Sequence, residues 1–309
     1  MDVPAFAADG LKYPVKPVRL VTGSAPGGGS DLVARTLSEK LAERFGQAVI
    51  VDNRPGAGGV IGAELVAKSN PDGYTLLINT GSAIAVNPAL HAVPYDVKRD
   101  FIALMQVSRA PFVLAVNPAL PAKSVGELIP LLKANPKKYS YASSGLGSVS
   151  HLAMELFKNM TGVNVVHVPY RGSAPAAIDL IAGLVQLAMN NIVPTLPHVR
   201  SGRVRALGVS GPLRSHVLPE VPTVAEAGVP GFEAMQWYGV LLPAKTPKPV
   251  AAVLFKEISA VLQIPVVRMR LTEEGGDVVG STPEQFAAYI SLETEKWGRV
   301  VKAAGVRAE

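Results

Sequence analysis

Short runs of β-branched residues alternate along this chain with longer segments whose apolar residues repeat at helical spacing. The run VRLV (18–21) precedes a segment in which Leu37, Leu41 and Phe45 recur every four residues, and Gly46 follows as a helix stop. A second run, AVIV (48–51), comes next. This alternation predicts parallel strands whose connecting helices cover both faces of a sheet, the α/β class.

The same pattern continues over the rest of the chain. Ser124 is placed to cap a helix ending near Ala134, and residues 282–285 (TPEQ) form a capping-box signature for the last helix. Further strands are predicted at 74–79, 101–108, 112–116, 139–143, 164–168, 185–190, 204–210 and 237–243, and further helices near 60–68, 151–160, 176–183 and 249–262.

Loops rich in glycine and serine separate three of these strands from the helices that follow. They are residues 22–31 (TGSAPGGGSD), 144–150 (SGLGSVS) and 169–175 (PYRGSAP). The first turn of a helix has unpaired N–H groups and a partial positive charge, so such ends bind anions. Glycine and serine also serve ordinary strand-to-helix turns, and for any one loop that interpretation stays open. Two α/β halves that each present such a loop would hold an anion from both sides.

Composition narrows the class of protein. The chain has 309 residues, 48% of them hydrophobic and 17% charged, which suits a large core divided between two domains. The net charge of +6 suits nucleic acid, a membrane surface or a small anion, but the basic residues lie singly along the chain. No nucleic-acid partner is expected, because basic and aromatic residues are not interleaved. No apolar run reaches about 18 residues, so no membrane insertion is expected.

Enzymatic motifs fail at the same loops. The first loop lacks the Gly-Lys-Ser/Thr ending of a phosphate-binding loop, and the second has Ser150 where a dinucleotide fingerprint needs its third glycine. No Gly-x-Ser-x-Gly elbow surrounds Ser30, Ser144 or Ser148, and His151 is the only nearby base. The chain has no cysteine, and no second histidine stands within a turn of His151. We therefore expect no catalytic residue, metal or cofactor; the alternative is an acyl- or phosphoryl-transfer enzyme that uses glycine-loop anion sites.

From Tyr13 to Gly305 the chain resembles the Bug-type periplasmic solute receptors of tripartite tricarboxylate transporters. The matching stretches include YPVKPVRLV, PGGGSDLVAR, VIVDNRPGAGGVIGAELVAKSNPDGYTLL, YASSGLGSVSHLAMELFKNMTGVNVVHVPYRGSAPAAIDLIAG and LPEVPTVAEAGVPGFEAMQWYGV. The resemblance implies a type II-like periplasmic-binding-protein fold of two domains, each a mostly parallel sheet flanked by helices, joined by two crossing strands. It also implies a monomer that closes on a small carboxylate and delivers it to a membrane transporter.

Both their chemistry and the resemblance indicate that the first two loops bind the ligand. The resemblance also implies that residues following two further strands line the rim of the ligand cleft. The predicted ligand-binding residues are Ser24, Ala25, Gly27, Gly28, Gly29, Ser30, Asp31, Thr80, Ser82, Ser144, Gly145, Gly147, Ser148, His151, Gly172, Ser173, Ala174 and Asn190.

We expect neutral donors to hold the acid: the amides of 25–30 and 145–148, serine hydroxyls and water. Asp31 is expected to orient the first helix turn or to meet a water or an ammonium group, and Arg171 is the rival ion-pairing anchor. The family often has an aspartate where this chain has Met189, Asn190 and Asn191, which leaves open how the far end of the ligand is selected. Dicarboxylates, tricarboxylates, acidic amino acids and other organic acids all fit these loops.

The predicted domain boundaries follow from the two crossings. PFVLAVNP (111–118) carries the chain into the second domain and EAMQWYGVLLP (233–243) brings it back. The first domain then combines 1–111 with 235–309, and the second spans 112–234. Trp237 and Tyr238 fall at the hinge, as core packing or as ligand contacts. Residues 5–7 (AFA) resemble the end of a secretory cleavage site, so we expect a periplasmic protein whose signal peptide is absent from this chain.

Overall fold

The computed structural model describes residues 12–273 and 275–306, so residues 5–7 lie outside it. Within that range ten strands form one sheet in the order β2-β1-β3-β9-β4-β7-β5-β6, with β10 and β8 also paired to β4. The strands are β1 (Val18–Thr22), β2 (Val49–Asn53), β3 (Thr75–Thr80), β4 (Phe101–Val116), β5 (Ser140–Ser143), β6 (Val166–Pro169), β7 (Leu187–Asn191), β8 (Arg205–Val209), β9 (Met235–Pro243) and β10 (Asp277–Val278).

Helices connect the strands. The predicted helices lie close to their expected positions, whereas the helical segments at 57–59, 82–86, 87–90, 97–100, 192–200 and 265–272 were not predicted. The described helices are α1 (Gly29–Phe45), η1 (Ala57–Gly59), α2 (Val60–Ala67), η2 (Ser82–Val86), α3 (Asn87–Leu90), α4 (Val97–Asp100), α5 (Val125–Ala134), α6 (Val149–Thr161), α7 (Ser173–Ala182), α8 (Ile192–Arg200), α9 (Lys248–Leu262), α10 (Pro265–Thr272) and α11 (Pro283–Ala304).

Two predicted helix starts show the cap chemistry expected from sequence. The Ser124 hydroxyl accepts a hydrogen bond from the Glu127 amide at 3.1 Å at the start of α5. At α11 the Thr282 hydroxyl accepts from the Gln285 amide, and the Gln285 side chain accepts from the Thr282 amide, so the capping box is confirmed. Each such cap contributes about 1 kcal/mol to helix stability.

The outer strands of the sheet are parallel, and the strands that join its two ends are antiparallel. β1 pairs in parallel with β2 and β3, and β5 pairs in parallel with β6 and β7. β9 is antiparallel to both β3 and β4, and β7 is antiparallel to β4. The α/β class is therefore confirmed, with the predicted parallel arrangement in the outer strands.

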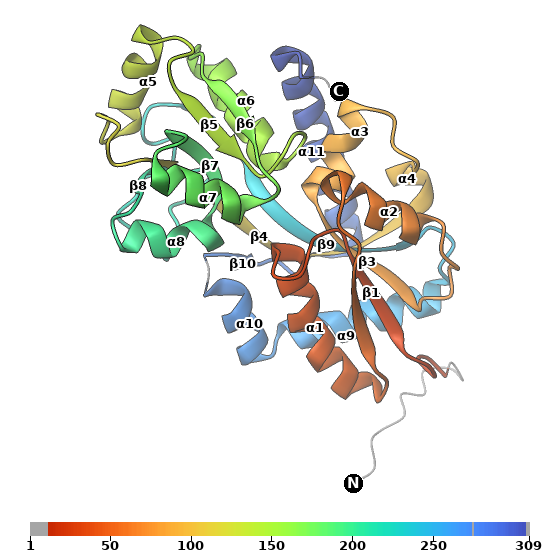
Figure 1. Ribbon diagram of the computed structural model, residues 1–309. Coiled ribbons are helices and arrows are strands. Elements are labelled where there is room, and N and C mark those ends of the chain that lie inside the picture. The colour runs from red at the N-terminus through yellow and green to blue at the C-terminus, as the bar shows by residue number, and fades with distance from the viewer. Residues whose placement is uncertain (1–11, 274, 307–309) are drawn as a thin grey trace.

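Strand β4 links the two ends of the sheet. Its residues Phe101–Pro111 pair with β9, and its residues Phe112–Val116 pair with β7. The sequence predicted two separate strands here, at 101–108 and 112–116. The structure joins them because 109–111 remain extended and pair with 235–237, and the φ of proline suits an extended chain. Figure 1 shows β5–β8 with α5–α8 at one end of the sheet, β1–β3 with α1 and α2 at the other, and β4 and β9 between.

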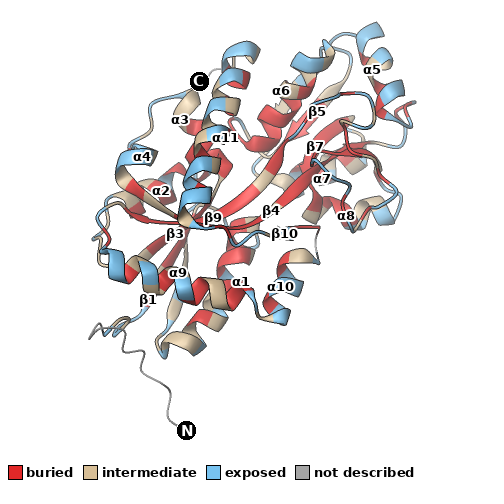
Figure 2. Ribbon diagram, turned by 180° about the vertical axis from the view of Figure 1, so that it is seen from behind, coloured by how far each residue is buried: buried red, intermediate tan, exposed pale blue. Residues whose placement is uncertain are grey.

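The central strands carry the core. Figure 2 shows β4, β7 and β9 buried along most of their length, while the outer sides of the helices are exposed. Trp237 of β9 and Trp297 of α11 are fully buried, and both indole N–H groups donate to one Glu293 carboxylate oxygen, at 3.3 and 2.9 Å. Helix α11 packs against η2, α3 and α6, and so contacts elements from both ends of the sheet.

Within residues 12–273 and 275–306 no single helix has the length and apolar composition needed to cross a membrane, although the bent pair α9 and α10 meets both criteria when taken together.

Candidate functional site

The first glycine loop is organised by a serine side chain. Helix α1 begins at Gly29 after Gly28, which supplies no side-chain cap. The Ser24 hydroxyl takes that role, because it accepts from the Asp31 amide at 3.1 Å and from the Ser30 hydroxyl at 2.8 Å. The amides of Gly29 and Ser30 occupy the first two helical positions, which have no acceptor within a helix. The loop therefore presents these two N–H groups at the positive end of α1.

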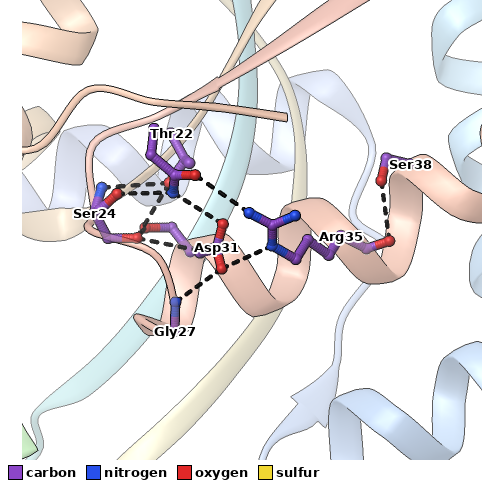
Figure 3. Close-up of polar contacts among 8 residues, drawn as sticks. Thr22, Ser24, Gly27, Asp31, Arg35 and Ser38 are labelled. Carbon is purple, nitrogen blue, oxygen red and sulfur yellow. Dashed lines mark hydrogen bonds and ion pairs between the residues drawn. The ribbon is translucent and has the colours of Figure 1, made fainter. Parts of the chain in front are cut away.

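Asp31 holds this loop in place, which is one of the roles that the sequence left open for it. Its carboxylate accepts from the Gly27 amide at 2.9 Å, from Arg35 Nε at 3.0 Å and from Asn53 Nδ2 at 2.8 Å (Figure 3). Burial alone raises the pKa of Asp31, but the bonds from Arg35, Gly27 and Asn53 outweigh it and lower the pKa below its ordinary value. Asp31 is therefore a charged residue whose described contacts are structural.

Tyr238 connects the first loop to the far end of the sheet. A Cβ built on Gly29 would overlap the Tyr238 hydroxyl, so only glycine permits this approach. The same hydroxyl accepts from Asn191 Nδ2 at 3.3 Å. Trp237 and Tyr238 are both buried, in agreement with the packing role considered for them. The Tyr238 side chain thus contacts both the start of α1 and the end of β7.

The second glycine loop uses most of its amides internally. The Gly145 amide donates to Ser143 Oγ at 3.2 Å, the Gly147 amide to His151 Nδ1 at 3.3 Å, and the Ser148 amide to the Gly145 carbonyl at 3.1 Å. Ser148 Oγ caps α6 by accepting from the His151 amide. The expectation that amides 145–148 are available to a ligand is therefore wrong for these three, because the tight turn pairs them locally.

The second and third loops still offer serine hydroxyl groups and the first amides of helix α7 as possible ligand contacts. Ser144 Oγ lies 2.9 Å from Ser150 Oγ, and the Ser144 carbonyl accepts from the Gly172 amide at 3.1 Å, which ties the two loops together. Gly172 has φ 116°, a conformation that favours glycine, and precedes α7. Ser173 and Ala174 are the first two residues of α7, so their amides are also without an acceptor in the helix.

The predicted rim after β3 contacts the second loop directly. Ser82 Oγ accepts from the Val149 amide, the first of α6, at 3.2 Å. Thr80 is half-buried, and its amide donates to Asn79 Oδ1 at 2.9 Å. The Ser82 bond joins residues 67 positions apart, from opposite ends of the sheet.

The buried His151 stacks on the half-buried His167 behind the second loop. Their rings lie 4.0 Å apart and nearly parallel, and Tyr141 stacks on His167 at 4.9 Å. Burial and the nearby Lys158 lower the pKa of His151 to about 4. Burial, then His151, lowers the pKa of His167 to about 4 as well. Both rings are neutral at pH 7, and His151 supports the loop through its bond to Gly147.

This stack predicts acid sensitivity. Because the folded pKa of about 4 lies below the ordinary 6.5, the unfolded chain binds protons first as pH falls, so stability is full above pH 6.5 and is lost towards pH 4. We expect each of the two histidines to lower the unfolding free energy by about 2 kcal/mol between pH 7 and pH 4.5. Urea unfolding at both pH values measures this.

The matched comparison is His167→Gln, which should reduce the pH-dependent loss, with the exposed His216→Gln as the control that retains it. An unchanged pH dependence in His167→Gln would contradict the assignment.

Several residues that support these loops were missed by sequence reasoning. Asn53 donates to both the Ser24 carbonyl and Asp31, and Thr22 Oγ1 accepts from the Ser24 amide at 3.3 Å. Asn53 ends β2, which is parallel to β1, and the carboxyl ends of parallel strands meet at one edge. That rule could have found Asn53. Tyr238 was placed at the hinge from sequence, but its contact with Gly29 arises from the tertiary fold, and no sequence signal marks that contact.

The described residues give little support to catalysis. The one close hydroxyl and imidazole pair at these loops is Ser143 Oγ and His167 Nε2, at 2.7 Å. Ser143 is only 1% exposed, and a histidine with a pKa of about 4 is a poor base at neutral pH. Among residues 12–273 and 275–306, no group of three or more histidine, aspartate or glutamate side chains could hold a metal ion.

Comparison with known proteins gives consistent matches over most of the chain. A sequence profile described as "Tripartite tricarboxylate transporter family receptor" matches residues 33–306. The protein BugT of Bordetella pertussis is 39% identical over 297 residues, which cover 96% of this chain and 91% of BugT.

Two solved structures are similar in fold and sequence. Rpa4515 of R. palustris, solved with adipate, has a TM-score of 0.89 and 37% identity over 96% of this chain and 99% of its own. MatC of Rhodopseudomonas palustris, solved with bound malate, has a TM-score of 0.85 and 32% identity over 94% of this chain and 100% of its own.

Proposed function

The chain belongs to the receptor family of the tripartite tricarboxylate transporters, and from this premise we propose that it binds a small carboxylate between its glycine loops. Adipate and malate in the related structures support a dicarboxylate or a similar organic acid as the ligand. The receptor then delivers the acid to a membrane transporter. We place this work in the periplasm, by a monomer without enzymatic turnover.

One chain of contacts carries the proposal: the starts of helices α1 and α7, which belong to opposite ends of the sheet, are linked through Tyr238 and the end of β7. Gly29 of α1 lies against Tyr238, whose hydroxyl binds Asn191. The adjacent Asn190 donates to the Ser173 carbonyl at the start of α7 at 3.1 Å. A carboxylate between the two helix starts would meet the amides of Gly29 and Ser30 from one side and those of Ser173 and Ala174 from the other.

These donors are strong enough without a salt bridge. A partly buried helix start contributes up to about 2 kcal/mol to anion binding, and each hydrogen bond to a charged group contributes roughly 1.5–3 kcal/mol. Two helix starts with a few such bonds approach the −8 kcal/mol that corresponds to about micromolar affinity. Arg171, next to Gly172, remains the rival anchor.

We further propose that the protein closes around the acid as two domains, 1–111 with 235–309, and 112–234. The change of partners along β4 at Pro111 and Phe112, and the start of β9 at Met235, support these boundaries. In this division the bond from the Val149 amide to Ser82 Oγ joins the two domains. A ligand favours the closed state through contacts that exist only there.

A thermal-shift screen of organic acids, combined with mass spectrometry of each acid after incubation, tests the function. We expect at least one di- or tricarboxylate to raise the melting temperature at millimolar concentration and to be recovered unchanged. Stabilisation arises because a ligand that binds only the folded state shifts unfolding by mass action. Conversion of an acid to product, or no stabilisation by any carboxylate, would contradict the proposal.

A further inference from the structure

Asn190 has a buried oxygen atom without a hydrogen-bond partner. The side chain is 1% exposed, and among the described residues, 12–273 and 275–306, no donor reaches its Oδ1. Nearly all buried polar atoms in native proteins are paired, because water cannot compensate the loss of a hydrogen bond there. An unpaired oxygen at this depth is therefore open to a donor that the described residues do not supply.

The orientation of this amide is fixed by its neighbour. Asn190 Nδ2 donates to the Ser173 carbonyl at 3.1 Å. A carbonyl oxygen only accepts hydrogen bonds, so a flipped amide would place two oxygens against each other. The atom left available is therefore the oxygen, and its partner has to be a donor.

Asn190 lies beside the third loop and level with the second. Its amide contacts the start of α7 through Ser173, and the β5–β7 register, in which Ala142 faces Ala188, brings Asn190 level with Ser144. The next residue, Asn191, reaches Tyr238 and so the first loop. This placement, together with the unpaired oxygen, marks a ligand contact beside the carboxylate-binding helix starts.

The chemistry of the surroundings separates two kinds of donor. A ligand ammonium group would be a buried charge and would need a carboxylate partner. Asp31 is the one carboxylate among the predicted site residues, and it is already bound to Arg35, Gly27 and Asn53. A neutral hydroxyl needs no counter-charge, and one hydrogen bond to Oδ1 satisfies it.

Resting on the proposed function, we propose that the ligand is a hydroxylated carboxylic acid whose hydroxyl group donates to Asn190 Oδ1. Asn190 then selects hydroxy acids over their deoxy parents and over the corresponding amino acids. A deoxy acid leaves Asn190 Oδ1 without a hydrogen bond, and this difference favours the hydroxy acid.

Isothermal titration calorimetry with matched acids tests this inference: succinate, malate and aspartate, and glutarate, 2-hydroxyglutarate and glutamate. In the series that binds more tightly, we expect the hydroxy acid to bind about tenfold more tightly than its deoxy parent and more tightly than the amino acid. Asn190→Leu, which keeps the branching at Cγ but has no acceptor, should reduce the ratio of hydroxy to deoxy affinity to about one.

The ratio of hydroxy to deoxy affinity distinguishes a loss of selectivity from structural damage, because a disturbed fold weakens the binding of both acids together. Asn135→Leu removes an amide at the end of α5 whose hydrogen bonds go to the Leu131 carbonyl and to Lys138, and should leave the ratio unchanged. Equal binding of hydroxy and deoxy acids, as an ordered water on Asn190 would give, overturns this inference but leaves the carboxylate receptor intact. Tighter binding of the amino acid also overturns it. If no acid in either series binds, the inference fails, and the thermal-shift screen of organic acids decides separately whether the proposed function stands.

Discussion

Replacing Gly29 with alanine is expected to abolish carboxylate binding. The added Cβ would overlap the Tyr238 hydroxyl, and Tyr238 is buried between β9 and the start of α1, so the first turn of α1 has to move. That movement displaces the Gly29 and Ser30 amides together. We expect a loss of at least about 100-fold in affinity, equivalent to about 2.7 kcal/mol, and a loss of about 1–3 kcal/mol in unfolding free energy from overpacking.

Titration calorimetry and urea unfolding of Gly29→Ala measure both effects. Gly298→Ala is the matched control, because a Cβ there meets no atom within 4 Å and the residue lies within α11. It should bind normally and gain about 0.5–1 kcal/mol in stability, as alanine does in helices. Normal binding by Gly29→Ala would show that the start of α1 does not hold the acid.

Removing the Asp31 side chain is expected to weaken both the fold and binding, although Asp31 touches no ligand in this account. Asp31→Ala leaves the Gly27 amide and Asn53 Nδ2 without their acceptor and Arg35 without its ion pair. Losing a buried charged acceptor with several partners costs about 2–4 kcal/mol. Because the loop 24–30 then loses its support, affinity should fall about tenfold or more.

Unfolding and titration of Asp31→Ala are compared with Asp277→Ala. The Asp277 side chain is 58% exposed, and its oxygen lies 3.8 Å from Arg109, so its removal should change stability by less than about 0.5 kcal/mol. Full stability with lost affinity in Asp31→Ala would instead indicate that Asp31 contacts the ligand.

Local sequence signals predicted much of the fold because they act over a few residues. The caps at Ser124 and Thr282 and the strand runs flanked by glycine loops needed no tertiary information. The single strand β4 was missed, since only its pairing with β9 keeps 109–111 extended. The loops were identified from their glycine and serine residues alone. Which of their amides are already hydrogen-bonded within the loop was not predicted, because this pairing depends on the turn geometry of Gly145 and Gly147.

The residues that bring the loops together were harder to predict. Tyr238, Asn191 and His167 act through contacts between segments far apart in the chain. Asn190 was selected from sequence, but its unpaired oxygen appears only once Ser173 is placed against its amide nitrogen. The sequence shows that residue 190 is an asparagine, but it does not show which way the side-chain amide faces.

The most direct test of the account is a crystal structure of the protein saturated with the acid that stabilises it most. The account predicts a ligand carboxylate within hydrogen-bond distance of the Gly29 or Ser30 amide on one side and the Ser173 or Ala174 amide on the other, with no salt bridge to Arg171. A carboxylate paired with the Arg171 guanidinium and away from both helix starts would contradict it.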